Sequence, residues 1–253
     1  MSLPGRILGF LRGVMRPLAT SPERRTALGP GSRVGSYELI ERLGAGGMGE
    51  VWKAHHIVLD RVVALKLAHQ SSGLGSRMAE ALRHEARVLA SLTGPQFTEV
   101  FDAGSFDGMT FLAMEWFEGR DLHHHVSTGG PLDSSQTARV LESLARALEH
   151  VHESGLVHCD VKPANIMLKN DLRTLSLIDF GIARHLGGDV LDSEHVTGTP
   201  AFMAPEHVAA PATVATPADI YALGCVGYFL LTGEPPFDGA SAAEVFSEHI
   251  YGK

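Results

Sequence analysis

The alternation of apolar and polar residues between positions 37 and 116 predicts a small region built mainly from β-strands. The expected strands are Tyr37–Gly44, Glu50–His56, Val62–Leu67, Glu99–Ala103 and Met109–Trp116. Apolar residues recur at helical spacing in only one stretch of this region, Arg77–Leu92, where Met78, Leu82, Ala86 and Leu89 share one face. Five strands and one helix therefore predict a compact lobe with a mostly β architecture.

The pattern beyond Glu118-Gly119 is mostly helical. Ser134–Ser154 is predicted to be a long amphipathic helix whose apolar face carries Val140, Leu144, Leu148 and Val151. Asp133, Ser134 and Ser135 are all suitable N-terminal caps. The longest apolar run, Tyr221–Leu231, contains two glycines and follows Asp219, so it predicts a buried core helix rather than a membrane span.

Residues 1–19 place eight apolar side chains on one side of a helical wheel and Arg6, Arg12 and Arg16 on the other. This amphipathic pattern is typical of helices that lie on an anionic membrane surface. The alternative is a disordered extension whose pattern is accidental, and the three glycines on the polar side favour it. Residues 20–35, rich in Gly, Pro, Ser and Arg, are expected to form a linker.

Composition and charge restrict the class of protein. The chain has 253 residues, 44% hydrophobic and 20% charged, which is typical of a globular protein. The net charge is −8, but residues 1–33 carry +5, so the remainder carries −13. An acidic body argues against a nucleic-acid surface and suits either a basic partner or simple solubility. Only two cysteines occur, Cys159 and Cys225, which argues against a disulfide framework and for a reducing compartment.

The glycine-rich turn Gly44-Ala45-Gly46-Gly47-Met48-Gly49 joins two of the predicted strands. Glycines allow backbone N–H groups to approach phosphates closely. The G-x-G-x-x-G pattern alone is weak, since it also occurs between a strand and a helix in dinucleotide-binding folds. Here a strand follows, so a hairpin is favoured; a flexible hairpin without a ligand remains the alternative.

Lys66 lies in the apolar strand V-A-L-K, where a lysine is costly unless its charge is paired. Glu85, on the helix that follows, is the candidate partner. The alternative is a surface lysine whose stem lies along apolar surface with its ammonium group in water.

The segment His158-Cys159-Asp160-Val161-Lys162-Pro163-Ala164-Asn165-Ile166 concentrates chemistry in a few positions. Asp160 can accept a proton from a substrate hydroxyl, and Lys162 can neutralise a transferring phosphoryl group. Two short apolar strands, Ile166–Leu168 and Leu175–Ile178, are expected to bring Asn165 and Asp179 to a common place. Their oxygens suit a hard ion such as Mg²⁺.

His123-His124-His125 cannot converge on one metal, because consecutive helical residues point about 100° apart.

These motifs, in this order, resemble the protein-kinase family, and more narrowly the bacterial serine/threonine kinases of eukaryotic type. The resemblance runs from Tyr37 to about Phe237. The matching motifs are the glycine loop with Val51, Val63-Ala64-Leu65-Lys66, Glu85, the segment from His158 to Asn165, Asp179-Phe180-Gly181 and Ala204-Pro205-Glu206.

The resemblance implies a bilobal α+β fold, with a five-stranded lobe carrying one main helix and a larger, mostly helical lobe. It implies an extension over 1–35 and a kinase domain over 36–253, with the small lobe over about 36–117 and the large lobe over about 118–253. ATP would bind between the lobes with Mg²⁺, or Mn²⁺ as an alternative metal. The adenine would lie between Leu43, Val51, Ala64 and Met167; Met114 would be the gatekeeper, and Glu115 to Phe117 the hinge.

The resemblance also assigns supporting roles in the larger lobe. Lys162-Pro163 and Gly198-Thr199-Pro200 resemble serine/threonine-kinase signatures, and Thr199 would hydrogen-bond near Asp160 and Lys162. Asp219 resembles the buried aspartate that supports the backbone of the catalytic loop.

Cys159 departs from the family by replacing an arginine that pairs with an activation-loop phosphate. A thiol cannot form that pair, so we expect activity that does not depend strongly on phosphorylation of Ser193 or Thr197. A redox role for Cys159 is an alternative to a plain filler of space.

The end of the chain at Lys253, where further family helices are expected, is a second departure. The arginine that pairs with the glutamate matching Glu206 is not found downstream, so the charge of Glu206 is expected to lack its partner. Without the further helices, the apolar underside of the 221–231 helix is expected to be partly uncovered. The expected explanations are a fragment, completion by a dimer or partner chain, or a marginal lobe.

The motifs therefore favour ATP-dependent phosphorylation of protein serine and threonine hydroxyls in the cytoplasm, with membrane contact through residues 1–19 as an added possibility. The alternative is a catalytically weak or inactive kinase-like module that binds nucleotide or a partner. A small-molecule kinase is disfavoured by the Gly-Thr-Pro and Ala-Pro-Glu segments, which in the family belong to the protein-substrate platform.

Overall fold

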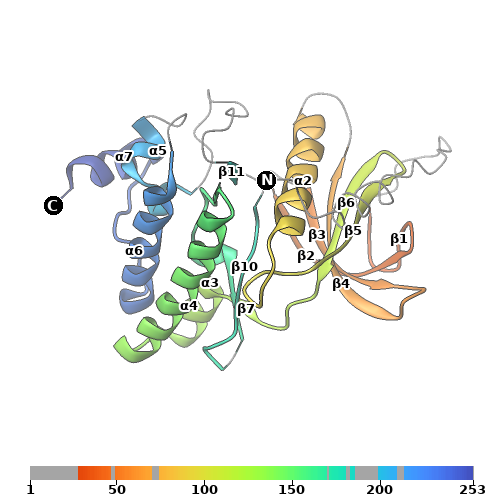
Figure 1. The fold of residues 1–253 in the computed structure, drawn as a ribbon, viewed down its shortest axis with the longest axis horizontal. Helices are drawn as coiled ribbons and strands as arrows, with labels where there is room; N and C mark the ends of the chain where they lie inside the picture. Colours follow the sequence, from red (N-terminus) through yellow and green to blue (C-terminus); the bar gives the residue numbers. More distant parts are fainter. Residues whose placement is uncertain are drawn as a thin grey trace. The chain divides into compact units, whose positions relative to one another are not determined.

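A computed structural model describes residues 28–46, 49–69, 74–169, 171–180, 183–185, 199–209 and 214–252. The described chain divides into two compact units (Figure 1). The first contains the residues up to Thr93 together with Thr98–Phe117; the second contains Gly94–Phe97 and the residues from Glu118 onward. Gly94–Phe97, which the expected small lobe over about 36–117 includes, thus groups with the second unit. The predicted amphipathic segment 1–19 lies outside the described residues.

The first unit is built on one antiparallel sheet with the strand order β1-β2-β3-β4-β6-β5. The strands are β1 (Arg33–Val34), β2 (Tyr37–Gly46), β3 (Gly49–His56), β4 (Arg61–His69), β5 (Val100–Phe106) and β6 (Met109–Glu115). Each of the five predicted strands is present. The sixth, β1, corrects the prediction, because Arg33–Val34 falls within the stretch expected to be a linker.

The core of this sheet follows from the alternation in sequence. Leu39 of β2, Trp52 of β3 and Leu65 of β4 point to the same face of the sheet and are at most 2% exposed. Strand β6 is buried at every position except Glu115, because it pairs with a strand on each side and packs against α2. This near-continuous apolar run is typical of a strand covered on both faces.

Helix α2 (Leu74–Ser91) packs on this sheet, with contacts to β4, β5 and β6. It begins three residues before the predicted start. Leu82, Ala86 and Leu89 are buried, as their helical spacing predicts. Glu85, one residue before Ala86, lies on the same buried side and is 2% exposed. A glutamate in such a place needs a partner.

The second unit is mostly helical. Its helices are α3 (Leu122–Gly129), α4 (Ser134–Glu153), α5 (Pro205–Ala209), α6 (Thr216–Thr232) and α7 (Ala242–Tyr251), with the short 3-10 helices η1 (Pro163–Asn165) and η2 (Pro200–Phe202). Helix α4 is capped by Asp133, which accepts from the N–H of Gln136 while Gln136 reaches back to the Asp133 N–H. The predicted apolar face of α4 is buried against α6.

Helices α4 and α6 approach closely at Gly227. A Cβ atom at this position would lie 3.0 Å from a methyl group of Leu141. Helix α6 buries eight of its 17 residues, as expected for a core helix, but Ile220, Tyr228 and Leu231 are each about half exposed. These three residues form an apolar stripe on the described surface.

Three short strands form a separate sheet in the second unit, and this sheet carries residues of the candidate site. Strand β9 (Ile166–Leu168) lies between β10 (Leu175–Leu177) and β7 (Arg120–Asp121), and both pairings are antiparallel. A separate pair is formed by β8 (Leu156–Val157) and β11 (Arg184–His185). Strands β7, β8 and β11 contain two residues each, too few to be predicted from alternation.

Both cysteines are free and buried, in agreement with the prediction that no disulfide framework exists. Across the described ranges, no helix is both long and apolar enough to span a membrane.

Candidate active site

The first candidate element is the glycine-rich turn, which is a hairpin as predicted. Gly44, Ala45 and Gly46 end β2 and pair across the turn with Val51, Glu50 and Gly49 of β3. Gly47 and Met48 lie outside the described residues. Gly49 has φ +115°, and a Cβ there would lie 2.0 Å from the carbonyl oxygen of Leu67. Only glycine fits this position.

Lys66 and Glu85 form an ion pair in the first unit. The Nζ atom of Lys66 lies 2.6 Å from Oε1 of Glu85, and their side chains are 16% and 3% exposed. Lys66 pairs with Val51 on β3 and with Leu112 on β6. Its ammonium group therefore extends from a strand that has a neighbouring strand on each side. The prediction that Glu85 pairs with Lys66 is confirmed, and the alternative of a surface lysine is excluded.

The remaining nucleotide-contact candidates of the first unit, apart from Phe117, lie on four adjacent strands, β2, β3, β4 and β6. Val51 and Ala64 are partly buried, whereas Leu43 is 44% exposed. Met114 is buried, and its sulfur accepts a hydrogen bond from Thr98. Glu115 ends β6, and Phe117 follows in irregular chain.

In the second unit, Asp160 is the centre of a polar cluster. Its Oδ2 atom accepts from Lys162 Nζ at 2.6 Å and from Asn165 Nδ2 at 2.9 Å. Asn165 Nδ2 also donates to the backbone carbonyl of Asp160 at 2.9 Å. Because both donors use Oδ2, the other carboxylate oxygen, Oδ1, has no hydrogen bond within the described ranges. That oxygen is the atom able to accept a proton from a hydroxyl group.

Asn165 and Asp179 are brought together by the β9–β10 hairpin. Asn165 directly precedes β9 and Asp179 follows β10, and because the strands are antiparallel these ends meet. The backbone N–H of Ile178 donates to the carbonyl of Asn165 at 2.9 Å, which fixes the junction. Since Nδ2 of Asn165 is directed to Asp160, its Oδ1 is left for a cation. The predicted convergence is confirmed.

Asp179 has a left-handed backbone, with φ +65°. A non-glycine residue in this region usually marks a turn or a functional constraint. The next side chain, Phe180, is completely buried, with its ring 4.5 Å from that of His158 and 6.1 Å from that of Phe97. The buried Phe180 thereby anchors the segment that carries Asp179.

Asp219 on α6 supports the backbone before Asp160. It is 1% exposed, and its Oδ2 and Oδ1 atoms accept from the N–H groups of His158 and Cys159, both at 2.9 Å. Cys159 has φ +66°, an unfavourable conformation for a residue with a side chain. The two hydrogen bonds to a carboxylate stabilise it, as predicted for Asp219.

His152 and His158 extend this support, and His152 was not among the residues predicted from the sequence. Nε2 of His152 lies 2.8 Å from Asp219 Oδ2. His152 follows Leu148 by four residues on α4, so a polar side chain on the buried face was the available signal. His158 is fully buried, which lowers its pKa, and its Nδ1 accepts from the N–H of Asp160 at 3.2 Å.

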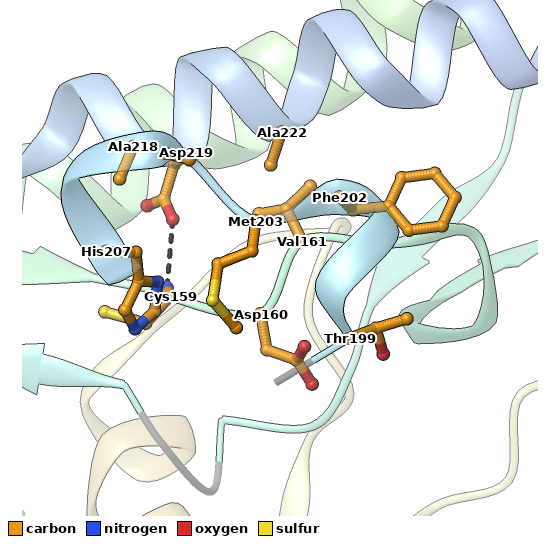
Figure 2. Close-up of a pocket in the computed structure, with 11 residues that line it drawn as sticks. Cys159, Asp160, Val161, Thr199, Phe202, Met203, His207, Ala218, Asp219 and Ala222 are labelled. Atoms are coloured by element: carbon orange, nitrogen blue, oxygen red, sulfur yellow. Dashed lines mark hydrogen bonds between the residues drawn. The ribbon is translucent and has the colours of Figure 1, made fainter. Parts of the chain in front are cut away.

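A pocket lies beside Asp160 in the second unit (Figure 2). Asp160, Thr199 and Phe202 line one part of it, while Cys159 and His207 line another. Cys159 is 7% exposed, and its sulfur lies 3.6 Å from the carbonyl of Val157. The expected hydrogen bond from the Thr199 hydroxyl to Asp160 or Lys162 is absent among the described residues, although Thr199 faces the same pocket.

Other predicted residues of the second unit are placed as follows. Met167 is partly buried in β9. Glu206 is exposed on α5, and no ion pair involves it in the described part of the chain. Gly181, Ser193, Thr197 and Gly198 lie outside the described residues.

Comparison with known proteins gives consistent findings. A family model described as "Protein kinase domain" matches residues 37–252. The chain is 37% identical over 221 residues to a probable serine/threonine-protein kinase of Corynebacterium efficiens, covering 85% of this chain and 33% of that protein. It is 33% identical to serine/threonine-protein kinase PrkC of Bacillus subtilis, covering 87% and 34%.

A third relative, serine/threonine-protein kinase PknH of Mycobacterium bovis, is 38% identical over 223 residues, covering 88% of this chain and 37% of that protein. The chain therefore spans about a third of the length of the curated relatives that it matches.

Proposed function

The chain belongs to the protein kinase family, and we propose that it transfers the γ-phosphoryl group of ATP to serine or threonine hydroxyl groups of proteins. The observation that carries this proposal is the hydrogen bonding of the Asp160 carboxylate. Lys162 and Asn165 both bind its Oδ2, which orients the carboxylate and leaves Oδ1 for a substrate hydroxyl. This arrangement suits a group that accepts a hydroxyl proton while the oxygen attacks phosphorus.

Lys162 has a second task in this proposal. Its ammonium group lies 2.6 Å from the carboxylate that takes the proton, so it is also close to the reacting oxygen. A cation there stabilises the charge that builds up on the transferring phosphoryl group. Thr199 would support the same region from the part of the pocket that it shares with Asp160, through contact with Asp160 or the substrate rather than through a hydrogen bond already formed.

ATP would be held by the backbone of the Gly44–Gly49 turn and by Lys66. Gly49 has no side chain, and this allows its backbone to pack directly against Leu67 of β4. N–H groups in a glycine-rich turn bind phosphate oxygens. Glu85 orients Lys66 through the 2.6 Å ion pair. Leu43, Val51, Ala64 and Met167 would contact the adenine, with Met114 at its inner edge and the backbone of Glu115 to Phe117 along its polar edge.

Asn165 and Asp179 would hold the divalent metal. Both offer oxygen donors, and the hydrogen bonds of Asn165 Nδ2 leave its amide oxygen for the ion. The described residues contain no group of three or more histidine, cysteine or acidic side chains placed to hold a metal. Two protein oxygens are the set that Mg²⁺ accepts when phosphate and water supply the rest, and Mn²⁺ has similar preferences. When bound, the ion neutralises phosphate charge and fixes the orientation of the phosphates.

The catalytic loop is of the non-RD type, with Cys159 in place of arginine. Cys159 is buried beside His207 and Met203, so it fills space that would otherwise hold a long side chain (Figure 2). The left-handed backbone at Cys159 is held by Asp219, a buried internal carboxylate, and this contact involves no phosphate. We infer that the loop is formed without activation-segment phosphorylation.

The domain limits and partners follow from the same proposal. The match over residues 37–252 supports a kinase domain over 36–253 and an extension over 1–35. Protein substrates are the expected partners, and the cytoplasm is the expected compartment because ATP is supplied there. The basic, amphipathic pattern of residues 1–19 supports peripheral contact with an anionic membrane.

The test is ATP turnover by this chain with a mixture of unstructured serine- and threonine-containing peptides, with Mg²⁺ present and after its removal with a chelator. We expect label from the γ-phosphate of ATP on serine and threonine only, and only with Mg²⁺. Absence of labelled peptide while the chain remains folded would contradict the proposal.

A further inference from the structure

His249 on helix α7 is a buried histidine with two differently placed ring nitrogens. The residue is 7% exposed, and its Nδ1 lies 2.7 Å from the hydroxyl oxygen of Tyr221 on α6. Its ring also packs edge-on against Phe237, with centroids 4.7 Å apart. The other nitrogen, Nε2, is buried and makes no hydrogen bond within the described ranges. An unsatisfied buried polar atom calls for an explanation.

The ring of His249 lies against η2. The backbone carbonyls of Pro200 and Ala201 act on the imidazole and favour its charged form, while burial favours the neutral form more strongly and lowers the pKa of His249. Helix α7 contacts η2 directly, and η2 also contacts α6. On the α6 side, the ring of Phe202 packs edge-on against Phe229 at 6.2 Å. The 3-10 turn is therefore held from two helices at once.

η2 forms part of the wall beside the catalytic carboxylate. Thr199 directly precedes η2, Phe202 ends it, and both line the pocket that Asp160 also lines (Figure 2). None of the residues assigned above to ATP or the metal belongs to η2. A shift of η2 would thus change the surface next to Oδ1 of Asp160, where a substrate hydroxyl must arrive, without moving the groups that hold the nucleotide.

The protonation states support a defined hydrogen bond between His249 and Tyr221. Burial raises the pKa of Tyr221 to about 12, so its hydroxyl keeps its proton at neutral pH. The neutral imidazole has one nitrogen able to accept and one able to donate. If Tyr221 donates to Nδ1, the proton of the ring is on Nε2, the nitrogen available to the carbonyls of η2. One side chain then links α7 to α6 by a hydrogen bond, while the helix that carries it packs against η2.

We propose that His249 is a positioning residue: through Tyr221 it ties α7 to α6, and it thereby holds η2 where a protein substrate is presented to Asp160. This inference rests on the proposed function, since it concerns how the protein substrate of the same site is bound. It assigns to His249 no contact with ATP, metal or the reacting atoms.

The test uses four single variants of the full chain and the double variant His249→Ala/Tyr221→Phe. His249→Ala removes the ring, and His249→Asn keeps a polar atom near the position of Nδ1. Tyr221→Phe removes only the hydroxyl partner. The matched control is His124→Ala, which removes an exposed histidine from helix α3 of the same unit.

The first readout is the kinetics of peptide phosphorylation, with KM measured separately for peptide and for ATP. We expect His249→Ala to raise KM for peptide about tenfold, the loss expected for one buried hydrogen bond, with KM for ATP within about twofold of wild type. His249→Asn should recover most of the loss, and Tyr221→Phe should reproduce part of it. Adding Tyr221→Phe to His249→Ala should cause little further loss, because both act through one contact.

A purely structural role would lower kcat or the folded fraction and leave both KM values unchanged, and that result would overturn the proposal. An equal rise in both KM values would overturn it as well.

The second readout does not need activity. The amides of Phe202 and Met203 donate to the carbonyls of Thr199 and Pro200, both at 3.1 Å, so hydrogen exchange reports whether η2 is formed. His249→Ala should speed exchange at these two amides about tenfold, and His124→Ala should not. Unchanged exchange in His249→Ala would overturn the proposal.

The two proposals fail in different ways. A wild-type chain that transfers no phosphate contradicts the proposed function and, with it, the role in substrate presentation, whereas a failure of this inference alone shows only in the variants.

Discussion

The Nζ atom of Lys66 lies 2.6 Å from Oε1 of Glu85, which joins strand β4 to helix α2 through two largely buried charges. Removing one member of such a pair costs far more than the pair contributes, because a buried charge loses its counterion. We therefore expect Lys66→Met to lower the free energy of unfolding by about 3 kcal/mol, and Lys66→Met/Glu85→Leu to recover most of that loss. Urea unfolding of the four proteins in the cycle measures this, and strictly additive losses would contradict the pairing.

Asp219 supports the catalytic loop with a buried carboxylate that accepts three hydrogen bonds, from the backbone N–H groups of His158 and Cys159 and from the ring of His152. Hydrogen bonds to a charged group contribute about 1.5–3 kcal/mol each. Asp219→Asn keeps the shape but loses the charge, so we expect a loss of stability of about 3 kcal/mol and a fall in kcat of at least tenfold.

His152→Gln is the comparison for Asp219→Asn, because it affects one of the three hydrogen bonds and leaves the backbone contacts in place. Its loss of stability should be about 1 kcal/mol. Equal effects of the two substitutions, measured by thermal unfolding and by kcat, would show that the backbone contacts are not what stabilises the loop.

The buried Cys159 predicts activity without phosphorylation of the activation segment. Ser193→Ala/Thr197→Ala should retain activity within about threefold of wild type, since no arginine is present in the catalytic loop to bind a phosphate there. Initial rates of peptide phosphorylation, with circular dichroism as a check on folding, measure the effect. Loss of activity in a folded double variant would refute this expectation.

His249 predicts part of the pH dependence of stability. Burial is the main cause of its lowered pKa, from an ordinary value of 6.5. Below about pH 6.5 the unfolded chain binds a proton at this position that the folded chain does not. The contribution of His249 to the free energy of unfolding is therefore fully present above that pH and is lost progressively as the pH falls. His249→Gln should reduce this decline by up to about 1.4 kcal/mol per pH unit between pH 6.5 and 5. An unchanged slope in urea titrations at several pH values would show that the imidazole takes up its proton freely.

The sequence predicted the elements whose pattern is regular. All five predicted strands of the first unit exist, as does the helix that carries Glu85, because alternation and helical spacing reflect which side chains face the core. The convergence of Asn165 and Asp179 was also predictable, since two short antiparallel strands separated by a turn leave their outer ends together. The pairing of Lys66 followed from the cost of a buried unpaired charge.

Other features depend on tertiary contacts that no local pattern records. Strand β1 exists because Arg33–Val34 pairs with β2, although its own sequence is that of a linker. His152 and His249 are single histidines on buried helix faces, one following Leu148 and the other following Val245 by four residues, and spacing alone does not distinguish a polar anchor from a tolerated core residue. The hydroxyl of Thr199 was expected to hydrogen-bond near Asp160, and the described residues show only a shared pocket.

The central claim is that the free carboxylate oxygen of Asp160, oriented by Lys162 and Asn165, accepts the proton of a protein hydroxyl during phosphoryl transfer. The most direct measurement is transfer of labelled γ-phosphate from ATP to serine- and threonine-containing peptides by the wild-type chain and by Asp160→Asn, at saturating Mg²⁺. We predict transfer by the wild type and a rate at least a hundredfold lower for Asp160→Asn, with ATP affinity and thermal stability nearly unchanged. Equal rates for the two proteins would contradict the account.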